Sequence, residues 1–515
     1  MALARTLSVA LVGVAGHLIE VEADIAQGLP ATIVVGLPDT ALREARDRIR
    51  AAIVNSGQAW PQSKITIGLS PASLPKRGSG FDLAIAIAIL AAADVLPLTS
   101  PAGIMFLAEL GLDGSLRPVP GVLPAVVAAA AGGVQTVVVA PGNAAEAELV
   151  PSVRVITAAS LAEVAIWLRG GPPPLPPDPP DDPPDQQDSV LAPAARHRDL
   201  AEVLGQSEAR KAAEICAAGG HNLSLLGPPG AGKTMLAERL PTILPRLDPV
   251  AALEVTSIHS VAGSLRPGAG LLTEPPFCAP HHTASKAAIV GGGSGIIRPG
   301  AASLAHRGVL FLDEAPEFQR DVLDALRQPL EAGEVVIARS AMCARFPARF
   351  TLVLAANPCP CAKASSGGAG CGCSPAARRR YLGRLSGPLL DRVDVKVQLQ
   401  PVSRHEMLYD RKFTETSAVV AQRVAAARER MARRLAGTSW RLNAEIPGAE
   451  LRRSFPPEQA AMRPLDRAME LGQVSARGAD KIVRVAWSVA DLAGKPRPGP
   501  AEVEVAIGLW LGVSR

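Results

Sequence analysis

The 515-residue sequence predicts an α/β fold class with three domains and one linker, and three observations lead to this prediction. Residues 172–184 contain nine prolines interleaved with aspartates, a composition typical of an extended spacer and not of a packed core. After this spacer, apolar strands alternate with helical segments, as a parallel sheet requires. Towards the C-terminus the pattern becomes helical, as in Ala418–Leu435 and Ala476–Ala493. The expected parts are an N-terminal unit at 1–168, a linker at 169–193, an α/β core at 194–400 and a helical lid at 401–515.

Composition excludes several classes of protein. Hydrophobic residues make up 48% of the chain but aromatic residues only 3%, so aliphatic side chains must fill the cores. The net charge of +5 is small for this length and says little about partners. Seven unevenly spaced cysteines argue against the disulfide framework of a secreted protein. The apolar runs Leu7–Ala15 and Leu83–Ala93 are too short for a signal peptide or a bilayer span, so we expect a cytoplasmic protein without a membrane partner.

The N-terminal unit predicts a mixture of strands and helices. Its strand segments are short, apolar and bounded by turn residues, whereas its helical segments are longer. We expect strands at Leu7–Val14, Leu18–Val21, Thr32–Gly36, Ile65–Ser70 and Val134–Ala140, and helices at Ala41–Ser56 and Phe81–Ala93. The second helix is apolar on all sides and should be buried.

The most specific motif of the chain lies early in the α/β core and fits G-x-x-x-x-G-K-[ST]. It consists of Gly227, Pro228, Pro229, Gly230, Ala231, Gly232, Lys233 and Thr234. The glycines allow backbone N–H groups to surround a phosphate, Lys233 can reach the β- and γ-phosphates, and Thr234 can bind Mg²⁺. A glycine-rich turn could match by chance. However, His221–Leu226 predicts a strand and Met235–Leu240 a helix, and this is the context that a nucleotide-binding loop requires.

A second motif follows about 75 residues later, where the apolar segment Val309–Leu312 ends in two acids. Asp313 would hold the Mg²⁺ shell and Glu314 would polarise the attacking water. A strand ending in Asp-Glu is common and means little alone. Together with the first motif it predicts Mg²⁺-dependent ATP hydrolysis, without saying what the hydrolysis drives.

Three polar residues are candidates to complete this nucleotide site. Asn357 follows the predicted strand Phe350–Leu354 and would lie near the γ-phosphate, although a turn-forming Asn-Pro is locally just as natural. Arg392 is placed to reach the ATP of a neighbouring subunit, where such arginines contribute on the order of 10³–10⁵ in rate. It could also be an ordinary surface arginine. In the lid, we prefer Arg484 over Arg477 as the cation that senses the nucleotide.

Four stretches of the sequence resemble the magnesium-chelatase-like AAA+ family called ComM or YifB, and the resemblance covers nearly the whole chain. The stretches are Leu204–Gln206, Ala279–Thr283, Ser303–Phe318 and Ser386–Asp394. The resemblance implies an ATP-driven homohexameric ring. It also implies a branch-migration helicase that acts on single-stranded or branched DNA in recombination during natural transformation. Ala301 departs from the pattern, because many relatives carry a glutamate there, and this puts in doubt any role of an acid at that position.

Two insertions in the core are candidates for DNA contact. One is the glycine-rich loop Gly291–Gly300, and the other is a hairpin with arms at Glu334–Ile337 and Arg345–Phe350. The cations that could neutralise phosphates are Lys286, Arg298, Arg339 and Arg345. Each could instead be a solvated surface residue or part of a salt bridge between subunits. Because no row of aromatic residues accompanies them, the pattern favours tracking of the DNA backbone over base stacking.

Four cysteines follow Asn357 closely, as Cys359, Cys361, Cys371 and Cys373. The glycine- and serine-rich stretch between the two pairs could fold back and bring the thiols together. Four thiolates would suit a structural Zn²⁺, although C-x-C spacing is less usual than C-x₂-C. A redox pair and unligated cysteines remain alternatives. The neighbouring Arg378–Arg380 could meet DNA or another subunit.

The N-terminal unit resembles the proteolytic domain of Lon proteases, a ribosomal S5 domain 2-like α+β fold. The similar segments are Pro75–Leu83, Leu112–Gly121 and Val134–Pro141. That family needs a serine activated by a lysine. Here Gly80 and Leu123 occupy the two positions, Ser79 is one residue away, and no lysine occurs between Lys76 and Lys211. We therefore expect a Lon-like scaffold that is not a peptidase and that serves assembly or DNA contact.

Two other functions compete with the DNA translocase. A protein-remodelling ATPase, like the motor subunit of magnesium chelatase, would use the same ATP site. An ATP-dependent protease is disfavoured, because the serine and lysine of the Lon-like unit are missing.

Overall fold

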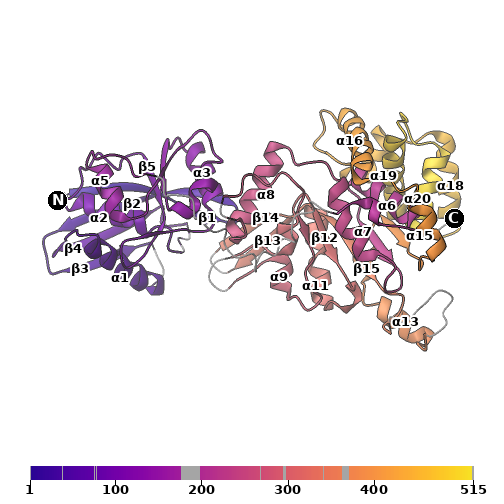
Figure 1. Ribbon diagram of the computed structural model, residues 1–515, viewed down its shortest axis with the longest axis horizontal. Helices are drawn as coiled ribbons and strands as arrows, with labels where there is room; N and C mark the ends of the chain where they lie inside the picture. The colour runs from indigo at the N-terminus through magenta and orange to yellow at the C-terminus, as the bar shows by residue number, and fades with distance from the viewer. Residues whose placement is uncertain are drawn as a thin grey trace.

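The computed structural model of the chain describes residues 2–36, 39–74, 76, 78–175, 198–266, 268–293, 297–339, 342–361 and 371–512. Figure 1 shows an elongated molecule, with the N-terminal unit at one end, an α/β unit in the middle and the C-terminal helices at the other end. The α/β fold class expected from the sequence is confirmed. Most of the expected linker, from residue 176 onward, lies outside the described residues.

A seven-stranded mixed sheet forms the N-terminal unit, in the order β3-β4-β2-β1-β5-β8-β9. Its strands are β1 (Ala2–Val12), β2 (Ala15–Ala26), β3 (Ala31–Val35), β4 (Lys64–Ser70), β5 (Ile104–Leu107), β8 (Thr136–Val139) and β9 (Arg154–Thr157). Strands β1 and β2 form a long antiparallel hairpin, whose last pair is Val12 and Ala15. The expected strand Leu18–Val21 extends to twelve residues because β2 pairs with β1 on one side and β4 on the other.

The helices of this unit and one small ladder complete it. They are α1 (Asp39–Asn55), α2 (Asp82–Ala92), α3 (Val122–Ala131), α4 (Ala144–Ala147) and α5 (Leu161–Leu168), with the ladder β6 (Glu109–Leu110) and β7 (Leu116–Arg117). Every residue of α2 is buried, as its uniformly apolar sequence predicts. Burying each of its leucine and isoleucine side chains stabilises the unit by about 1.5–3 kcal/mol.

The middle unit contains a five-stranded parallel sheet in the order β11-β12-β15-β10-β16. These strands are β10 (Leu223–Leu226), β11 (Phe277–Cys278), β12 (Val309–Leu312), β15 (Thr351–Ala356) and β16 (Val395–Gln398). Its helices are α6 (Ser207–Gly219), α7 (Lys233–Arg239), α8 (Pro249–Ala262), α9 (Lys286–Val290), α10 (Ala301–Leu304), α11 (Arg320–Ala325) and α12 (Arg327–Ala332). Because all five strands run in parallel, their carboxyl ends and the loops that follow them meet at one edge.

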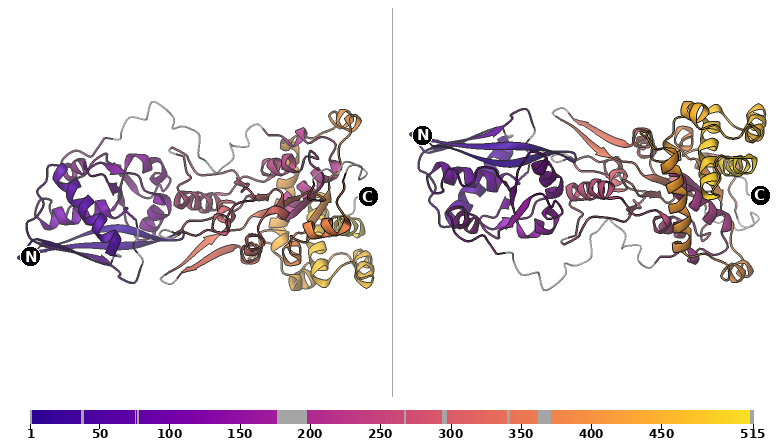
Figure 2. Two further views of the ribbon diagram at one scale, coloured as in Figure 1. Left: turned by 90° about the horizontal axis from the view of Figure 1, so that it is seen from below. Right: turned by 90° about the horizontal axis from the view of Figure 1, so that it is seen from above.

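A separate antiparallel hairpin, β13 (Glu334–Arg339) and β14 (Met342–Pro347), comes from the same unit. It matches the hairpin expected from the sequence. Figure 2 shows it projecting from the α/β unit on the side of the N-terminal unit.

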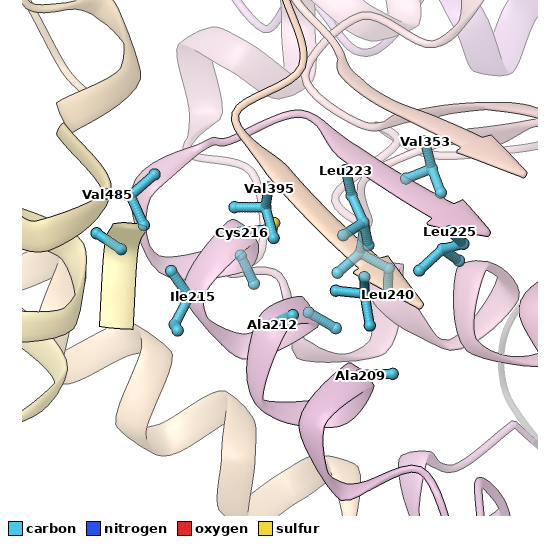
Figure 3. Close-up of a cluster of buried hydrophobic side chains, with 14 of the residues drawn as sticks. Ala209, Ala212, Ile215, Cys216, Leu223, Leu225, Leu240, Val353, Val395 and Val485 are labelled. Carbon is cyan, nitrogen blue, oxygen red and sulfur yellow. The ribbon is translucent and has the colours of Figure 1, made fainter. Parts of the chain in front are cut away.

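The helical region that follows packs directly on the α/β sheet. It comprises α13 (Pro375–Leu382), α14 (Gly387–Leu390), α15 (Arg404–Asp410), α16 (Ser417–Arg434), α17 (Gly448–Ser454), α18 (Gln459–Glu470), α19 (Ala476–Leu492) and α20 (Pro500–Leu511). One hydrophobic core runs from β10 through α6 to α19, and Figure 3 shows part of it. In this core Leu225, Cys216 and Val485 are fully buried. The lid and the sheet therefore share a single core.

Among the described residues, the N-terminal unit touches the α/β unit at two places. The backbone N–H of Gly121 donates to the carbonyl of Ser260 on α8 (3.1 Å), and the Ser260 hydroxyl donates to the carboxylate of Glu146. At the second place the β1–β2 turn meets β14, and a Cβ added to Gly13 would lie 2.4 Å from the carbonyl oxygen of Arg345. Leu11 packs beside this turn on a buried cluster that includes Phe346. The described chain is thus continuous in packing from one end to the other.

No helix in the described part of the chain combines the length and apolarity needed to cross a membrane.

Candidate nucleotide site

The loop between β10 and α7 turns at two glycines with left-handed backbone conformations. Gly230 has φ +76° and Gly232 has φ +89°, and Gly232 is the residue that caps α7. A side chain at either position would be strained, which explains why the motif requires glycine. Backbone N–H groups in such a turn form a concave surface that suits phosphate oxygens.

Lys233 is buried at the start of α7, and its ammonium group bridges two parts of the site. It donates to the carbonyls of Gly227 (2.7 Å) and Pro228 (3.0 Å) and to Oδ1 of Asn357 (3.0 Å). Burial lowers the pKa of Lys233, while the nearby charges of two acids, Asp313 and Glu314, oppose this shift. The structure thus brings Asn357 to the P-loop, because β15 lies between β10 and β12 in the sheet.

The hydroxyl of Thr234 and the carboxylate of Asp313 form the second half of the site. Thr234 Oγ1 donates to Asp313 Oδ2 at 2.8 Å, joining α7 to the end of β12. A hydroxyl and a carboxylate oxygen side by side are ligands that suit Mg²⁺, so the residues present fit the ion. Mg²⁺ would supply charge neutralisation for the phosphates of a bound nucleotide.

Glu314 follows Asp313 in a strained turn. Its φ is +49°, unusual for a residue other than glycine, and its backbone N–H donates to Asp313 Oδ1 at 2.9 Å. Strained conformations of this kind cluster at functional sites. The turn aims Asp313 and Glu314 separately, one towards Thr234 and the other towards the loop after β11.

Sequence reasoning missed a partner of Glu314. His282 Nδ1 lies 3.4 Å from Glu314 Oε2, and the ring of His282 contacts that of His281 in a tilted arrangement with centroids 4.0 Å apart. The order of the strands could have predicted the contact between His282 and Glu314, because the loop after β11 must lie beside the end of β12 in a parallel sheet.

Arg392 and Arg484, the two arginines expected at the nucleotide site, contact other parts of the chain. Arg392 ion-pairs with Glu331 of α12, and its side chain is only 12% exposed. Arg484 donates through Nε to the carbonyl of Ile446 at 2.8 Å, and burial lowers its pKa. In the part of the chain that the structure describes, neither arginine contacts the P-loop. Arg477, its competitor on α19, is exposed at the start of that helix.

The DNA candidates lie on α9, the glycine-rich loop and the hairpin. Lys286 and Arg298 are exposed. Arg345 pairs with Glu334 across the hairpin at 2.7 Å. Arg339 ends β13, but its side chain lies outside the described residues. The four cysteine sulfurs Cys359, Cys361, Cys371 and Cys373 lie within 4.8 Å of one another.

In the N-terminal unit, Ser79 is paired with an acid. Its hydroxyl donates to the carboxylate of Glu109, whereas the buried Lys76 donates to the carbonyl of Pro71. An acid that accepts from the hydroxyl does not provide the basic lysine partner that a Lon-type nucleophile requires.

A P-loop between a parallel strand and a helix, an Asp-Glu pair two strands away and a polar residue between them define an ATPase of the AAA+ class. Family models agree with this architecture. "Subunit ChlI of Mg-chelatase" matches residues 21–143, "Magnesium chelatase, subunit ChlI" matches 199–407, and the model of the ChlI C-terminal region matches 414–509.

Curated relatives extend over nearly the whole chain. An uncharacterized protein of Mycobacterium tuberculosis is 51% identical over 507 residues, covering 98% of both chains. The competence protein ComM of Haemophilus influenzae is 40% identical over 508 residues, covering 99% of this chain and 97% of its own. The magnesium-chelatase 38 kDa subunit of Acidiphilium rubrum is 28% identical over 200 residues, 38% of this chain and 49% of its own. The chain belongs to the ComM/YifB family of magnesium-chelatase-like proteins.

Proposed function

We propose that this protein is a cytoplasmic, ATP-hydrolysing homohexameric motor that translocates on DNA and drives branch migration in recombination or natural transformation. The nucleotide site supports the motor, because Lys233 contacts Asn357 and the adjacent Thr234 contacts Asp313. The similarity to a relative named as a competence protein supports the DNA pathway. Experiment must test the proposal that DNA is the substrate on which the motor acts.

One observation carries the DNA assignment: the two insertions expected to contact DNA pack against each other. A Cβ on Gly291 would lie 2.7 Å from the carbonyl oxygen of Arg298 and 2.9 Å from the Ile337 side chain on β13. The loop and the hairpin therefore form one projecting element that carries exposed cations. Such an element suits contact with a sugar–phosphate backbone, whatever the sequence of bases.

The ring is also part of the proposal. Lys233 is the cation at the P-loop, whereas Arg392 and Arg484 are engaged elsewhere in the same chain. We propose that Arg392 exchanges Glu331 for the nucleotide of the next subunit when the ring closes. An arginine supplied in this way stabilises the charge of the transition state. The N-terminal unit would then serve as a scaffold for assembly or DNA contact, without peptidase activity.

A second candidate is an ATPase that remodels a protein partner. The matches to ChlI family models and the similarity to a magnesium-chelatase subunit favour it. Both candidates use the same ATP site, so only the stimulating partner distinguishes them.

The test measures ATP turnover and DNA binding of the full chain with single-stranded and forked DNA over a salt series. We expect DNA to stimulate turnover and binding to weaken steeply with salt. Arg298→Ala should lower affinity and reduce the salt dependence by about one phosphate contact. Arg320→Ala, which removes a largely exposed arginine of α11 outside both insertions, serves as the matched control. Absence of stimulation together with salt-independent binding would reject the translocase and favour protein remodelling.

A further inference from the structure

We propose that Cys359, Cys361, Cys371 and Cys373 bind one structural zinc ion, and that this ion joins the loop after β15 to helix α13 and thereby positions the ATP site. The second part rests on the ATPase activity of the proposed motor but not on DNA as its load.

The sulfur positions fit one tetrahedral ion. Cys359 Sγ lies 3.3 Å from Cys361 Sγ and 3.4 Å from Cys371 Sγ, and the last two are 3.5 Å apart. All four sulfurs lie within 4.8 Å of one another. A tetrahedral Zn²⁺ with Zn–S bonds of about 2.3 Å separates its sulfur ligands by about 3.8 Å. Small side-chain adjustments therefore suffice to bind the ion.

The chemistry of the donors selects the metal. Four thiol ligands without a carboxylate suit Zn²⁺ and disfavour the oxygen-preferring Mg²⁺ and Ca²⁺. Three sulfurs at nearly equal separations also do not single out one disulfide pair. The predicted alternative of a redox pair is thus less well supported by this geometry than a shared ion.

An arginine lies beside the cysteine cluster, where its guanidinium can hydrogen-bond to a sulfur ligand of the metal. Arg378 Nη2 donates to Cys371 Sγ at 3.3 Å. Four thiolates around Zn²⁺ carry a net double negative charge, half of which one guanidinium offsets. Hydrogen bonds of this kind orient ligands and tune a metal centre.

The cluster connects to the ATP site on one side through the end of β15. Asn357 accepts from Lys233, and Cys359 follows two residues later, with only 1% of its surface exposed. Fixing the Cys359 sulfur therefore limits how far the Asn357 side chain can move from the P-loop.

On the other side the cluster connects to α13. Ser374, next to Cys373, caps this helix by accepting from the backbone N–H of Ala377. Tyr381, near the end of the helix, is buried against the backbone of Asn357. Arg384 then donates to the carboxylate of Glu317 (2.8 Å) in the turn that follows Glu314.

The ligands therefore lie between the end of β15, which is followed by Asn357, and α13, which is followed by Arg384 and its contact with the turn after Glu314. With the ion bound, the cysteines that follow β15 are held to the cysteines that precede α13. Asn357 is then connected through the ion and α13 to the turn after Glu314. Without the ion, the covalent chain and the contact of Tyr381 with the backbone of Asn357 are what join the two segments. We expect metal loss to lower the turnover number at least about 10-fold, since mutation of outer-shell partners in metal sites has effects of about 10–100-fold. The KM for ATP should change less, because the P-loop itself stays intact.

The test uses the full chain, purified without chelators, with zinc counted per chain by elemental analysis. We expect one zinc per chain in the native protein and in Cys343→Ser, which removes an exposed free thiol outside the cluster. Cys371→Ser should lose the zinc and lower turnover. A native protein that stays free of zinc after incubation with zinc chloride overturns the metal site, as does a Cys371→Ser variant that binds zinc equally well.

A second variant separates positioning from folding. Arg384→Ala leaves all four ligands in place but removes the contact with Glu317. It should keep its zinc and show a several-fold lower turnover number with little change in KM. If it and the zinc-free Cys371→Ser both turn over ATP like the native protein, the positioning role is wrong. Loss of turnover in these variants without any DNA stimulation of the native protein would support this inference and reject the translocase.

Discussion

The α/β unit and the N-terminal unit each contain a motif that looks catalytic in sequence, but their structures differ. At the P-loop, three parallel strands bring Asn357 into contact with Lys233 and Asp313 into contact with Thr234. In the N-terminal unit, Ser79 meets the acid Glu109. The difference shows that a motif becomes a site only where the topology delivers its partners. Four predictions can break or sharpen this comparison.

The largest effect is expected for Lys233→Ala. The variant removes the ammonium that joins the P-loop to Asn357, and removal of a single donor to a transition-state oxygen costs about 10²–10³ in rate. ATP turnover should fall at least about 100-fold in a phosphate-release assay. A near-native rate would mean that the α/β unit contains no working ATP site.

Glu314→Gln should separate binding from hydrolysis. The amide cannot accept a proton from water, and general base catalysis contributes about 10²–10⁴ in rate. The variant should retain bound, unhydrolysed ATP through a desalting column, whereas Lys233→Ala should retain little. Rapid turnover by Glu314→Gln would refute the assigned role.

Acid should affect the two units in opposite directions. Burial lowers the pKa of His221 and of His259, both in the α/β unit, to about 4. Between pH about 6.5 and about 4 the unfolded chain binds up to two more protons at these positions. The free energy of unfolding of the α/β unit therefore decreases as the pH decreases, by up to about 2.7 kcal/mol per pH unit.

In the N-terminal unit, burial raises the pKa of Asp82 to about 6. The folded unit then binds a proton that the unfolded chain releases, so this group adds stability as pH falls from about 6 to about 4. Hydrogen exchange, corrected for intrinsic rates, should show protection decreasing at pH 5 around β10 and α8 more than around α2. An equal loss in both units would contradict the prediction.

The smallest effect is expected for Ser79→Ala. Loss of one hydrogen bond to Glu109 should change the free energy of unfolding by about 1 kcal/mol. ATP turnover should be unchanged, and neither form should degrade a labelled unfolded protein in the presence of ATP. Degradation by the native chain that disappears in Ser79→Ala would remove the contrast between the two units.

Much of the fold and of the P-loop half of the site follows from sequence, because local patterns determine it. The apolar run of α2 predicted burial. The P-loop glycines, expected to allow backbone N–H groups to surround a phosphate, adopt left-handed conformations at Gly230 and Gly232. The β13–β14 hairpin also lies close to its expected position.

Residues whose partners come from distant segments were harder to place. Arg477 and Arg484 are seven residues apart on α19, and helical periodicity gives both the same face. Only the packing of Ile446, almost 40 residues earlier, decides that Arg484 is engaged inside the lid while Arg477 stays exposed. The contact of His282 with Glu314 was not predicted for a similar reason, since it depends on the pairing of β11 with β12.

The contact between Gly13 and Arg345 has a mechanical consequence. The β1–β2 turn lies so close to the backbone of β14 that even a methyl group would not fit between them. A hairpin that shifts during an ATP cycle must therefore carry the tip of the long N-terminal strands with it or slide across it. Through those strands, small motions at the hairpin would become larger motions at the far end of the N-terminal sheet, as with the short and long arms of a lever.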